Sequence, residues 1–176
     1  SKRISQTLQQ LRSKHSKNGV IQTHSLAAYQ LSELFKDQER VDLSQDFRQL
    51  AYDLTHPEDF PLPKLKVQAE LRDYQETGVK WLSMLNKYGF GGILADDMGL
   101  GKTLQTISFL TAHLTKSKKV LILAPSSLIY NWSDEFAKFA PHLDVAVVYG
   151  LKNVRDELIA EKHQITITSY ASFRQD

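Results

Sequence analysis

The residues of this chain best suited to chemistry form one glycine-rich run between positions 96 and 103. The run has two glycines, a lysine and a threonine at the spacing of phosphate-binding loops, and it comprises Asp96, Asp97, Met98, Gly99, Leu100, Gly101, Lys102 and Thr103. In such a loop, backbone N–H groups surround phosphate oxygens and a helix N-terminus adds partial positive charge. The lysine reaches the β- and γ-phosphates, and the threonine hydroxyl binds Mg²⁺. The run therefore predicts a site for a nucleoside triphosphate and Mg²⁺.

One position of the loop departs from the general pattern. A phosphate loop normally begins with glycine, and Asp96 stands there instead. Because a short Gly-x-Gly-Lys-Thr run also occurs in surface turns, the flanking elements decide between the two interpretations. The apolar residues 93–95 predict a strand before the loop, and residues 102–114 predict a helix after it. This order of elements favours nucleotide binding.

A dinucleotide-binding site is the nearest rival interpretation. That fold places an acidic residue at the end of the next strand, where it holds a ribose hydroxyl. The next apolar run ends in Ala124, Pro125 and Ser126, none of which is acidic. We therefore set this alternative aside.

The elements that position the loop alternate between apolar runs and helical patterns. Strands are predicted over 120–124, 145–149 and 165–168, and helices over 71–86, 102–114, 126–139 and 151–162. Ser126 or Ser127 is a suitable N-cap for the third of these helices. Continuous apolar strands separated by helices are typical of a parallel sheet covered on both faces. The predicted class is α/β.

The part of the chain before this domain has a different character. Pro57, Pro61 and Pro63 predict a linker over residues 56–66, because proline lacks a backbone donor and interrupts helices. Residues 1–55 are predicted to be mainly helical, with an extended segment over 19–24. The α/β domain then occupies residues 67–176.

Composition excludes several classes of function. The chain has no cysteine, so it has no disulfide, thiol nucleophile or cysteine zinc site. The six histidines do not fall at metal-ligand spacings. A net charge of +2 does not by itself indicate a nucleic-acid binder. No apolar run approaches the roughly 20 residues that span a bilayer, and we expect a cytoplasmic protein without membrane contact.

The residues around the loop resemble a known family. Before the loop they are Leu71, Arg72, Asp73, Tyr74 and Gln75, followed by Gly78, Trp81 and Leu82. After the loop they are residues 123–128, Asn131, Trp132, Glu135 and Phe136, and then residues 167–170. With the loop itself, this set resembles the Swi/Snf-type ATPases of helicase superfamily two over residues 65–176. That family uses the aspartate at 96, and Asp97 in place of its usual glutamate resembles bacterial members.

The resemblance implies a fold, an activity and residue roles. It implies the N-terminal part of the first RecA-like lobe of a motor that hydrolyses ATP with Mg²⁺ and moves along duplex DNA. Lys102 and Thr103 then serve catalysis, and the nucleotide pocket consists of the loop with Arg72, Tyr74, Gln75 and Leu104. DNA phosphates, contacted without regard to sequence, are assigned to Ser126, Ser127, Asn131, Ser169 and Tyr170. The implied location is the bacterial cytoplasm, at the nucleoid.

Part of the family's machinery is not found in this sequence. The family's acidic Asp-Glu box, which holds Mg²⁺ and orients water, does not follow Tyr170. We therefore expect a truncated lobe that binds ATP without hydrolysing it. We also expect a gap in the sheet beside residues 92–95. Two alternatives stay open: another P-loop NTPase such as a small kinase or GTPase, and a non-enzymatic interaction module built on residues 1–60.

Overall fold

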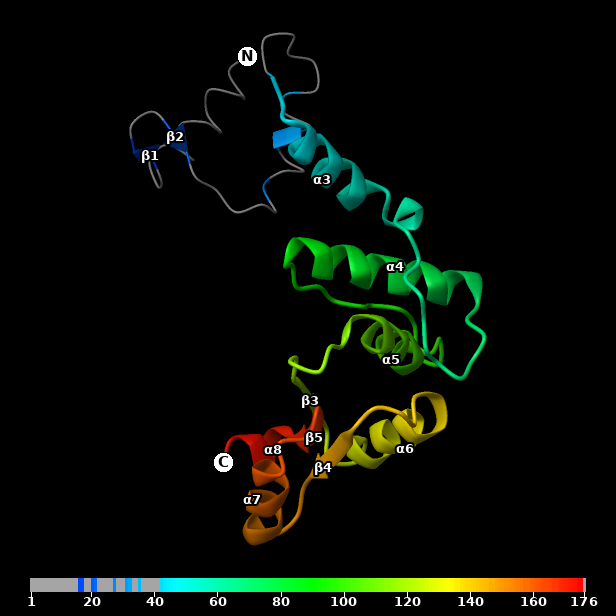
Figure 1. Cartoon of the computed structure of the whole chain (residues 1–176), viewed down its shortest axis with the longest axis vertical. Helices are drawn as coiled ribbons and strands as arrows, with labels where there is room; N and C mark the ends of the chain where they lie inside the picture. Colours follow the sequence, from blue (N-terminus) through cyan, green and yellow to red (C-terminus); the bar gives the residue numbers. More distant parts are fainter. Residues whose placement is uncertain are drawn as a thin grey trace. The chain divides into compact units, whose positions relative to one another are not determined.

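The computed structural model describes residues 42–175 continuously, and before them only residues 16–17, 20–21, 27, 31–32 and 35 (Figure 1). Strand β1 (Ser16–Lys17) pairs antiparallel with β2 (Val20–Ile21), so part of the predicted extended segment over 19–24 is confirmed. The other predictions for residues 1–41 lie outside the described residues. The chain divides into two compact units, one of residues 1–60 with 84–91 and one of residues 61–83 with 92–176.

In the first unit, helix α3 (Gln45–Thr55) lies in the region 1–55 that the sequence predicts to be mainly helical, and a short 3-10 turn, Pro57–Asp59, follows it. Asp53 is the only buried residue of α3, and its exposed fraction is 6%. The carboxylate accepts hydrogen bonds from Gln49 at 2.6 Å, Lys87 at 3.0 Å and Tyr88 at 2.6 Å. Burial alone raises the pKa of Asp53, but these donors together hold that pKa below its usual value.

Helix α4 (Asp73–Tyr88) begins two residues later than the sequence predicts. A reciprocal contact fixes its start. The Arg72 carbonyl accepts from the backbone N–H of Gln75 at 2.8 Å, and the Gln75 side-chain oxygen accepts from the Arg72 N–H at 3.0 Å. This is a capping-box arrangement, in which a side chain three residues into the helix satisfies an N-terminal donor. Gln75 therefore has a structural role before any ligand is considered.

The sheet of the second unit has three parallel strands in the order β3-β5-β4. They are β3 (Val120–Ala124), β4 (Val145–Val148) and β5 (Ile165–Ser169), each within one residue of its prediction. The ends of β3 and β5 are in register, with Ala124 opposite Ser169. Residues that follow these two strands are thus brought to one edge of the sheet, which the site below uses.

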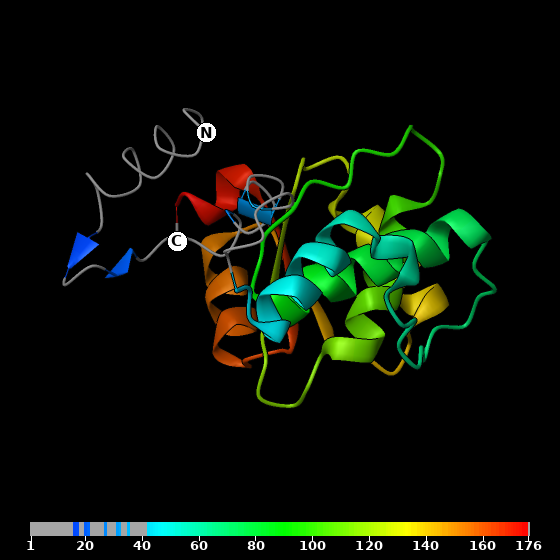
Figure 2. The ribbon, with the colours of Figure 1, turned by 90° about the horizontal axis from the view of Figure 1, so that it is seen from above.

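Helices cover both faces of this sheet, as predicted. Figures 1 and 2 show α6 (Ile129–Phe139) and α7 (Lys152–Ala160) on opposite faces. On the α6 side, α5 (Lys102–His113) completes a core that includes buried Ile107, Phe136 and Ile167. The short helix α8 (Tyr170–Phe173) follows β5 directly and was not predicted.

Two predicted elements are wrong in detail. Helix α6 begins at Ile129, and its N-cap, Leu128, makes no side-chain cap hydrogen bond. Ser126 and Ser127 therefore do not cap it. A turn closed by the Leu128 N–H and the Pro125 carbonyl at 2.8 Å delays the helix. Residues 92–95 are not a strand, because no described strand pairs with them.

The expected gap lay between a strand at residues 92–95 and the other strands, and since residues 92–95 form no strand, the structure does not show that gap. Strand β3 is an edge strand, and Ile93 is 86% exposed. On the α7 face a hollow of about 300 Å³ is lined mainly by apolar side chains, including Leu121, Val148 and Ile159. Leu121 is 48% exposed, although its strand reads as a buried one in the sequence. Apolar surface is left uncovered beside β3.

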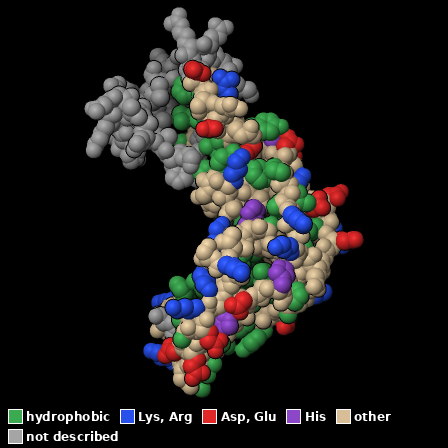
Figure 3. Space-filling view, viewed as in Figure 1, with side chains coloured by type: hydrophobic (Ala, Val, Ile, Leu, Met, Phe, Trp, Pro, Cys, Tyr) green, Lys and Arg blue, Asp and Glu red, His purple; other side chains and the backbone are tan. Residues whose placement is uncertain are grey.

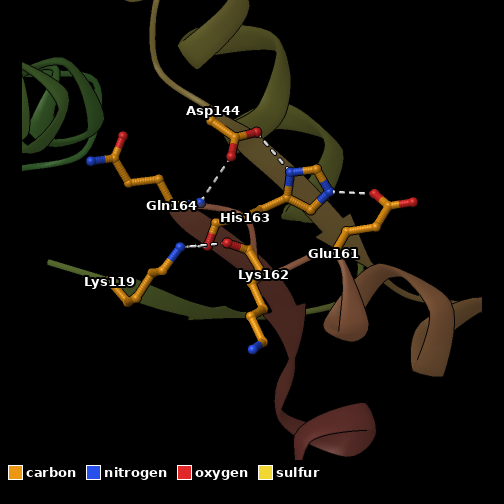
Figure 4. Close-up of polar contacts among 6 residues, drawn as sticks. All are labelled: Lys119, Asp144, Glu161, Lys162, His163 and Gln164. Atoms are coloured by element: carbon orange, nitrogen blue, oxygen red, sulfur yellow. Dashed lines mark hydrogen bonds and ion pairs between the residues drawn. The ribbon is translucent and has the colours of Figure 1, made fainter. Parts of the chain in front are cut away.

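Polar contacts join the segments that enter the three strands (Figure 4). His163 lies between two carboxylates, with Nδ1 2.7 Å from Asp144 and Nε2 2.7 Å from Glu161. These hydrogen bonds, the one to Asp144 first, raise the pKa of His163. The same contact lowers the pKa of Asp144. Lys119, before β3, donates to the carbonyls of Lys162 and His163.

Charges of both signs are interspersed over the described part of the face in Figure 3. No broad field of one sign is visible there, so binding of a charged ligand on this face would depend on particular groups. Among the described residues, no helix has the length and apolar content that crossing a bilayer requires.

Candidate nucleotide site

The loop before α5 has the backbone that a phosphate loop needs. Gly99 and Gly101 have φ values of 86° and 76°, in the left-handed region that glycine adopts without strain. A methyl group at Gly101 would also lie 2.6 Å from the side-chain nitrogen of Gln75. Position 101 therefore requires glycine for two reasons, its left-handed backbone conformation and the close approach of the Gln75 side chain. Met98, at the tip, is 95% exposed.

Lys102 is the cation of this loop. Its Nζ donates to the backbone carbonyl oxygens of Asp96 at 2.6 Å and Asp97 at 2.8 Å. An ammonium group carries three donors on a flexible stem, so these contacts can be exchanged for contacts to phosphate oxygens. The loop thus holds a positive charge at the position the sequence predicts.

The N-terminus of α5 is open to an anion. Its N-cap is Gly101, which has no side chain, and no acidic residue lies in its first turn. The first N–H groups of a helix have no partner within the helix, and together with the helix dipole they attract negative charge. Half-buried Thr103 lies in this first turn. The backbone, the lysine and the hydroxyl fit the phosphates of a nucleotide with Mg²⁺.

The described part of the chain contains no group of three or more His, Asp or Glu residues placed for a metal ion. At this site Thr103 would hold Mg²⁺ together with the phosphates of the nucleotide.

Gln75 is brought to the loop from α4. Its side chain is 7% exposed, and its nitrogen donates to the Leu100 carbonyl at 3.1 Å. Its oxygen accepts from Arg72, as described above. Arg72 and Tyr74 precede it in the sequence and are exposed. The structure thus places the Gln75 carboxamide on the loop backbone, whereas no contact of the Arg72 or Tyr74 side chain with the loop is seen among the described residues.

Sequence reasoning missed one residue of this site, Gln105. Its side chain is fully buried on α5, and its nitrogen donates to the Asp96 carboxylate at 2.8 Å. The available signal was a polar residue on the inner face of a helix combined with the aspartate that replaces the usual glycine. Neither observation alone identifies the contact.

The residues assigned to DNA divide into two groups. Ser126, Ser127 and Asn131 are exposed in the turn after β3 and the first turn of α6. Tyr170, after the neighbouring strand β5, is 56% exposed. Ser169 is 1% exposed, and its hydroxyl caps α8 by accepting from the Ser172 N–H at 3.1 Å. The strand register brings both groups to the same edge of the sheet. Ser126, Ser127, Asn131 and Tyr170 are accessible there, whereas Ser169 is buried.

Comparisons with known proteins agree with this geometry. Residues 74–176 match the family described as SNF2-related domain, and residues 1–63 match the one described as bacterial SNF2 helicase associated. YwqA of Bacillus subtilis, described as a "Putative ATP-dependent helicase/translocase", is 40% identical over 146 residues, which are 78% of this chain and 16% of YwqA. The ATP-dependent DNA helicase DDM1 of Arabidopsis thaliana is 46% identical over 112 residues, 57% of this chain and 14% of DDM1.

Solved structures give the same result. The SWI2/SNF2 ATPase core of Sulfolobus solfataricus in complex with double-stranded DNA matches with a TM-score of 0.60 and 40% identity. The match covers 66% of this chain and 25% of that core. The SWI2/SNF2 ATPase core domain of Sulfolobus solfataricus gives a TM-score of 0.54 at 39% identity. The chain thus spans a small part of each relative.

Proposed function

Since the chain belongs to the family of SNF2-related domains and has part of their RecA-like fold, we propose that it is the ATP-binding part of a DNA-dependent ATPase. Such a motor couples ATP hydrolysis to movement along duplex DNA. The observation that carries the proposal is the loop before α5, with Lys102 on two loop carbonyls and an uncapped helix N-terminus behind it.

The proposed chemistry of the loop is phosphate binding and charge neutralisation. Phosphate oxygens take the place of the Asp96 and Asp97 carbonyls as acceptors from Lys102. The first N–H groups of α5 receive a further oxygen. Mg²⁺, held through Thr103 and the phosphates, supplies additional positive charge for phosphoryl transfer. Lys102 and Thr103 are the residues of this chain that we assign to catalysis.

We assign the adenine end of the pocket to Arg72, Tyr74 and Gln75. A carboxamide offers both a donor and an acceptor, which suits the edge of a purine. To contact adenine, Gln75 must give up at least one of its bonds to Leu100 and Arg72. Nucleotide binding would then loosen the α4 cap, which links base recognition to the start of that helix.

We assign DNA contacts to the exposed end of the sheet, at Ser126, Ser127, Asn131 and Tyr170, with buried Ser169 supporting the Tyr170 segment through its cap of α8. Hydroxyl and amide groups next to a helix N-terminus suit phosphate oxygens and read no base sequence. The likeness to a core in complex with double-stranded DNA supports duplex DNA as the partner.

We propose a division of roles along the chain at the boundaries expected from the sequence. Residues 67–176 would bind nucleotide and DNA, residues 56–66 would act as a linker, and residues 1–55 would form an accessory region. The separate matches of residues 1–63 and 74–176 support this division. A motor acting on bacterial DNA works in the cytoplasm at the nucleoid, which is our assignment of location.

The test is nucleotide binding by the purified 176-residue chain, followed as a shift of its thermal unfolding midpoint with ATP·Mg²⁺, GTP·Mg²⁺ or neither. We expect ATP to raise the midpoint and Lys102→Ala to abolish the shift, because the only cation of the loop is lost. Lys116→Ala, at an exposed position, is the control and keeps the shift. A Lys102→Ala chain that still responds to ATP would refute the assignment, and an equal response to GTP would favour another P-loop NTPase.

A further inference from the structure

Gly78 lies inside helix α4, where glycine is less favourable than alanine. The structure shows what requires it. A methyl group at Gly78 would overlap the side-chain oxygen of Gln105 and lie 2.9 Å from its Cδ. The carboxamide of Gln105 therefore occupies the notch that the missing side chain leaves. Gly78 is unfavourable within α4, but the space beside it allows the polar side chain of Gln105 on α5 to be buried.

The burial of Gln105 is incomplete in its hydrogen bonding. The side chain is fully buried, its nitrogen donates to Asp96, and its oxygen has no partner within the described part of the chain. A buried acceptor without a partner is unfavourable. An apolar residue would fill the same space without that penalty, so the bond to Asp96 is what the glutamine provides.

Asp96 connects this bond to the phosphate loop. Its carboxylate is held by Gln105 at 2.8 Å, and its backbone carbonyl accepts from Lys102 at 2.6 Å. One contact holds the Asp96 side chain and the other holds its backbone carbonyl, so the first residue of the loop is fixed at two points. We infer that Gln105, seated in the Gly78 notch, is a positioning residue that holds Asp96 and so presets the loop and Lys102 for phosphate. This inference rests on the proposed nucleotide binding.

The first test compares the affinity of the 176-residue chain for a fluorescent ATP analogue with Mg²⁺. Gln105→Glu sets two carboxylates against each other, and we expect affinity to fall about tenfold or more at pH 8. Asp96→Ala removes the acceptor from the loop side, leaves the buried Gln105 nitrogen without this partner, and is expected to cause a similar loss of affinity.

Rescue separates positioning from packing. In the double variant Asp96→Asn/Gln105→Glu the hydrogen bond re-forms with its roles exchanged, because an amide can donate to a carboxylate or accept from a carboxylic acid. We expect its affinity to return to within about threefold of the parent. Gly78→Ala displaces the carboxamide and is expected to weaken binding like Gln105→Glu. Ser108→Ala is the matched control, since Ser108 is equally buried on α5 and its hydroxyl has no partner there.

The outcomes are distinguishable. If Lys102→Ala abolishes binding while Asp96→Ala and Gln105→Glu bind like the parent, the inference is overturned and the nucleotide site stands. If Lys102→Ala binds like the parent, the nucleotide site itself falls. If Gln105→Glu does not fold, Asp96→Ala decides alone. A double variant that unfolds at the parent's midpoint but shows no recovery of affinity also overturns the inference.

Discussion

Single buried polar residues in this chain hold segments that are distant in sequence. In the first unit, Asp53 of α3 accepts hydrogen bonds from Lys87 and Tyr88 at the end of α4. The ammonium of Lys87 also lies 5.3 Å from the ring centre of Phe60. One carboxylate therefore joins α3, the last turn of α4 and the segment after the 3-10 turn. Its removal affects more than its own helix.

We expect Asp53→Asn to destabilise the chain by about 1–3 kcal/mol, because the new amide group turns a donor toward a donor in a buried position. Denaturant unfolding followed by circular dichroism measures this. Asp46→Asn makes the same chemical change at an exposed position of α3 and is expected to change stability by less than about 0.5 kcal/mol. Equal effects of the two substitutions would contradict the role assigned to Asp53.

His163 makes part of the stability depend on pH. Its pKa is raised above 6.5 in the folded chain, so its contribution is fully present below about pH 6.5 and is lost as pH rises through the folded value. The pKa of Asp144 is lowered, so its contribution is lost only in strong acid. We expect His163→Gln to destabilise the chain more at about pH 6 than at about pH 9.

The comparison is made by thermal unfolding at both pH values. His142→Gln, at an exposed position before β4, is the control and should show no such difference. A His163→Gln chain with the same deficit at both pH values would mean that the ring stabilises by packing and not by charge.

At the scale of elements, the edge of the sheet is the least protected part of the second unit. Strand β3 has one partner, β5, and its Leu121 is 48% exposed next to an apolar hollow. Exposed edge strands pair with other chains unless charge or proline prevents it. We therefore expect the 176-residue chain to self-associate as its concentration rises.

Leu121→Lys is expected to reduce this association, because lysine on an edge strand disfavours pairing. Sedimentation at several concentrations measures it. Tyr130→Lys adds the same charge at a 58% exposed position of α6 and is expected to leave association unchanged. A parent chain that remains monomeric at all concentrations would refute the expectation.

Prediction from sequence succeeded where the signal is local. The apolar run 120–124 gave β3 to the residue, and Gly-Lys-Thr gave the start of α5. It failed at residues 92–95, because a strand exists only with a partner that local sequence does not reveal. It failed at Ser126 and Ser127 because a turn and a helix cap use the same residue types.

The candidate site follows the same rule. Lys102, Gly99 and Gly101 were predicted as residues of the phosphate loop, because the pattern of such a loop lies in consecutive residues. Gln105 was missed because its role depends on Gly78 in another helix and on Asp96 across the loop. A second non-local contact, from the Gln75 nitrogen to the Leu100 carbonyl, keeps the Gln75 carboxamide on the loop.

At the scale of the whole molecule, binding and turnover are separable. Phosphoryl transfer needs a carboxylate to hold Mg²⁺ and a residue to orient water, and the Asp-Glu box that provides both in the family does not follow Tyr170 in these 176 residues. We expect the 176-residue chain to bind ATP but to release no phosphate above background, with or without duplex DNA. A phosphate-release assay measures this, with Lys102→Ala as the background. DNA-stimulated turnover that Lys102→Ala abolishes would contradict it.

The notch at Gly78 has a consequence for how such sequences can drift over evolutionary time. Any side chain at position 78 would displace the carboxamide of Gln105. A shorter side chain at position 105 would leave a cavity beside Gly78, and glycine would then no longer be needed there. Each change alone is unfavourable, while the two together can be neutral. Positions 78 and 105 are therefore expected to change as a pair among relatives, with glutamine at the second kept only where glycine is kept at the first.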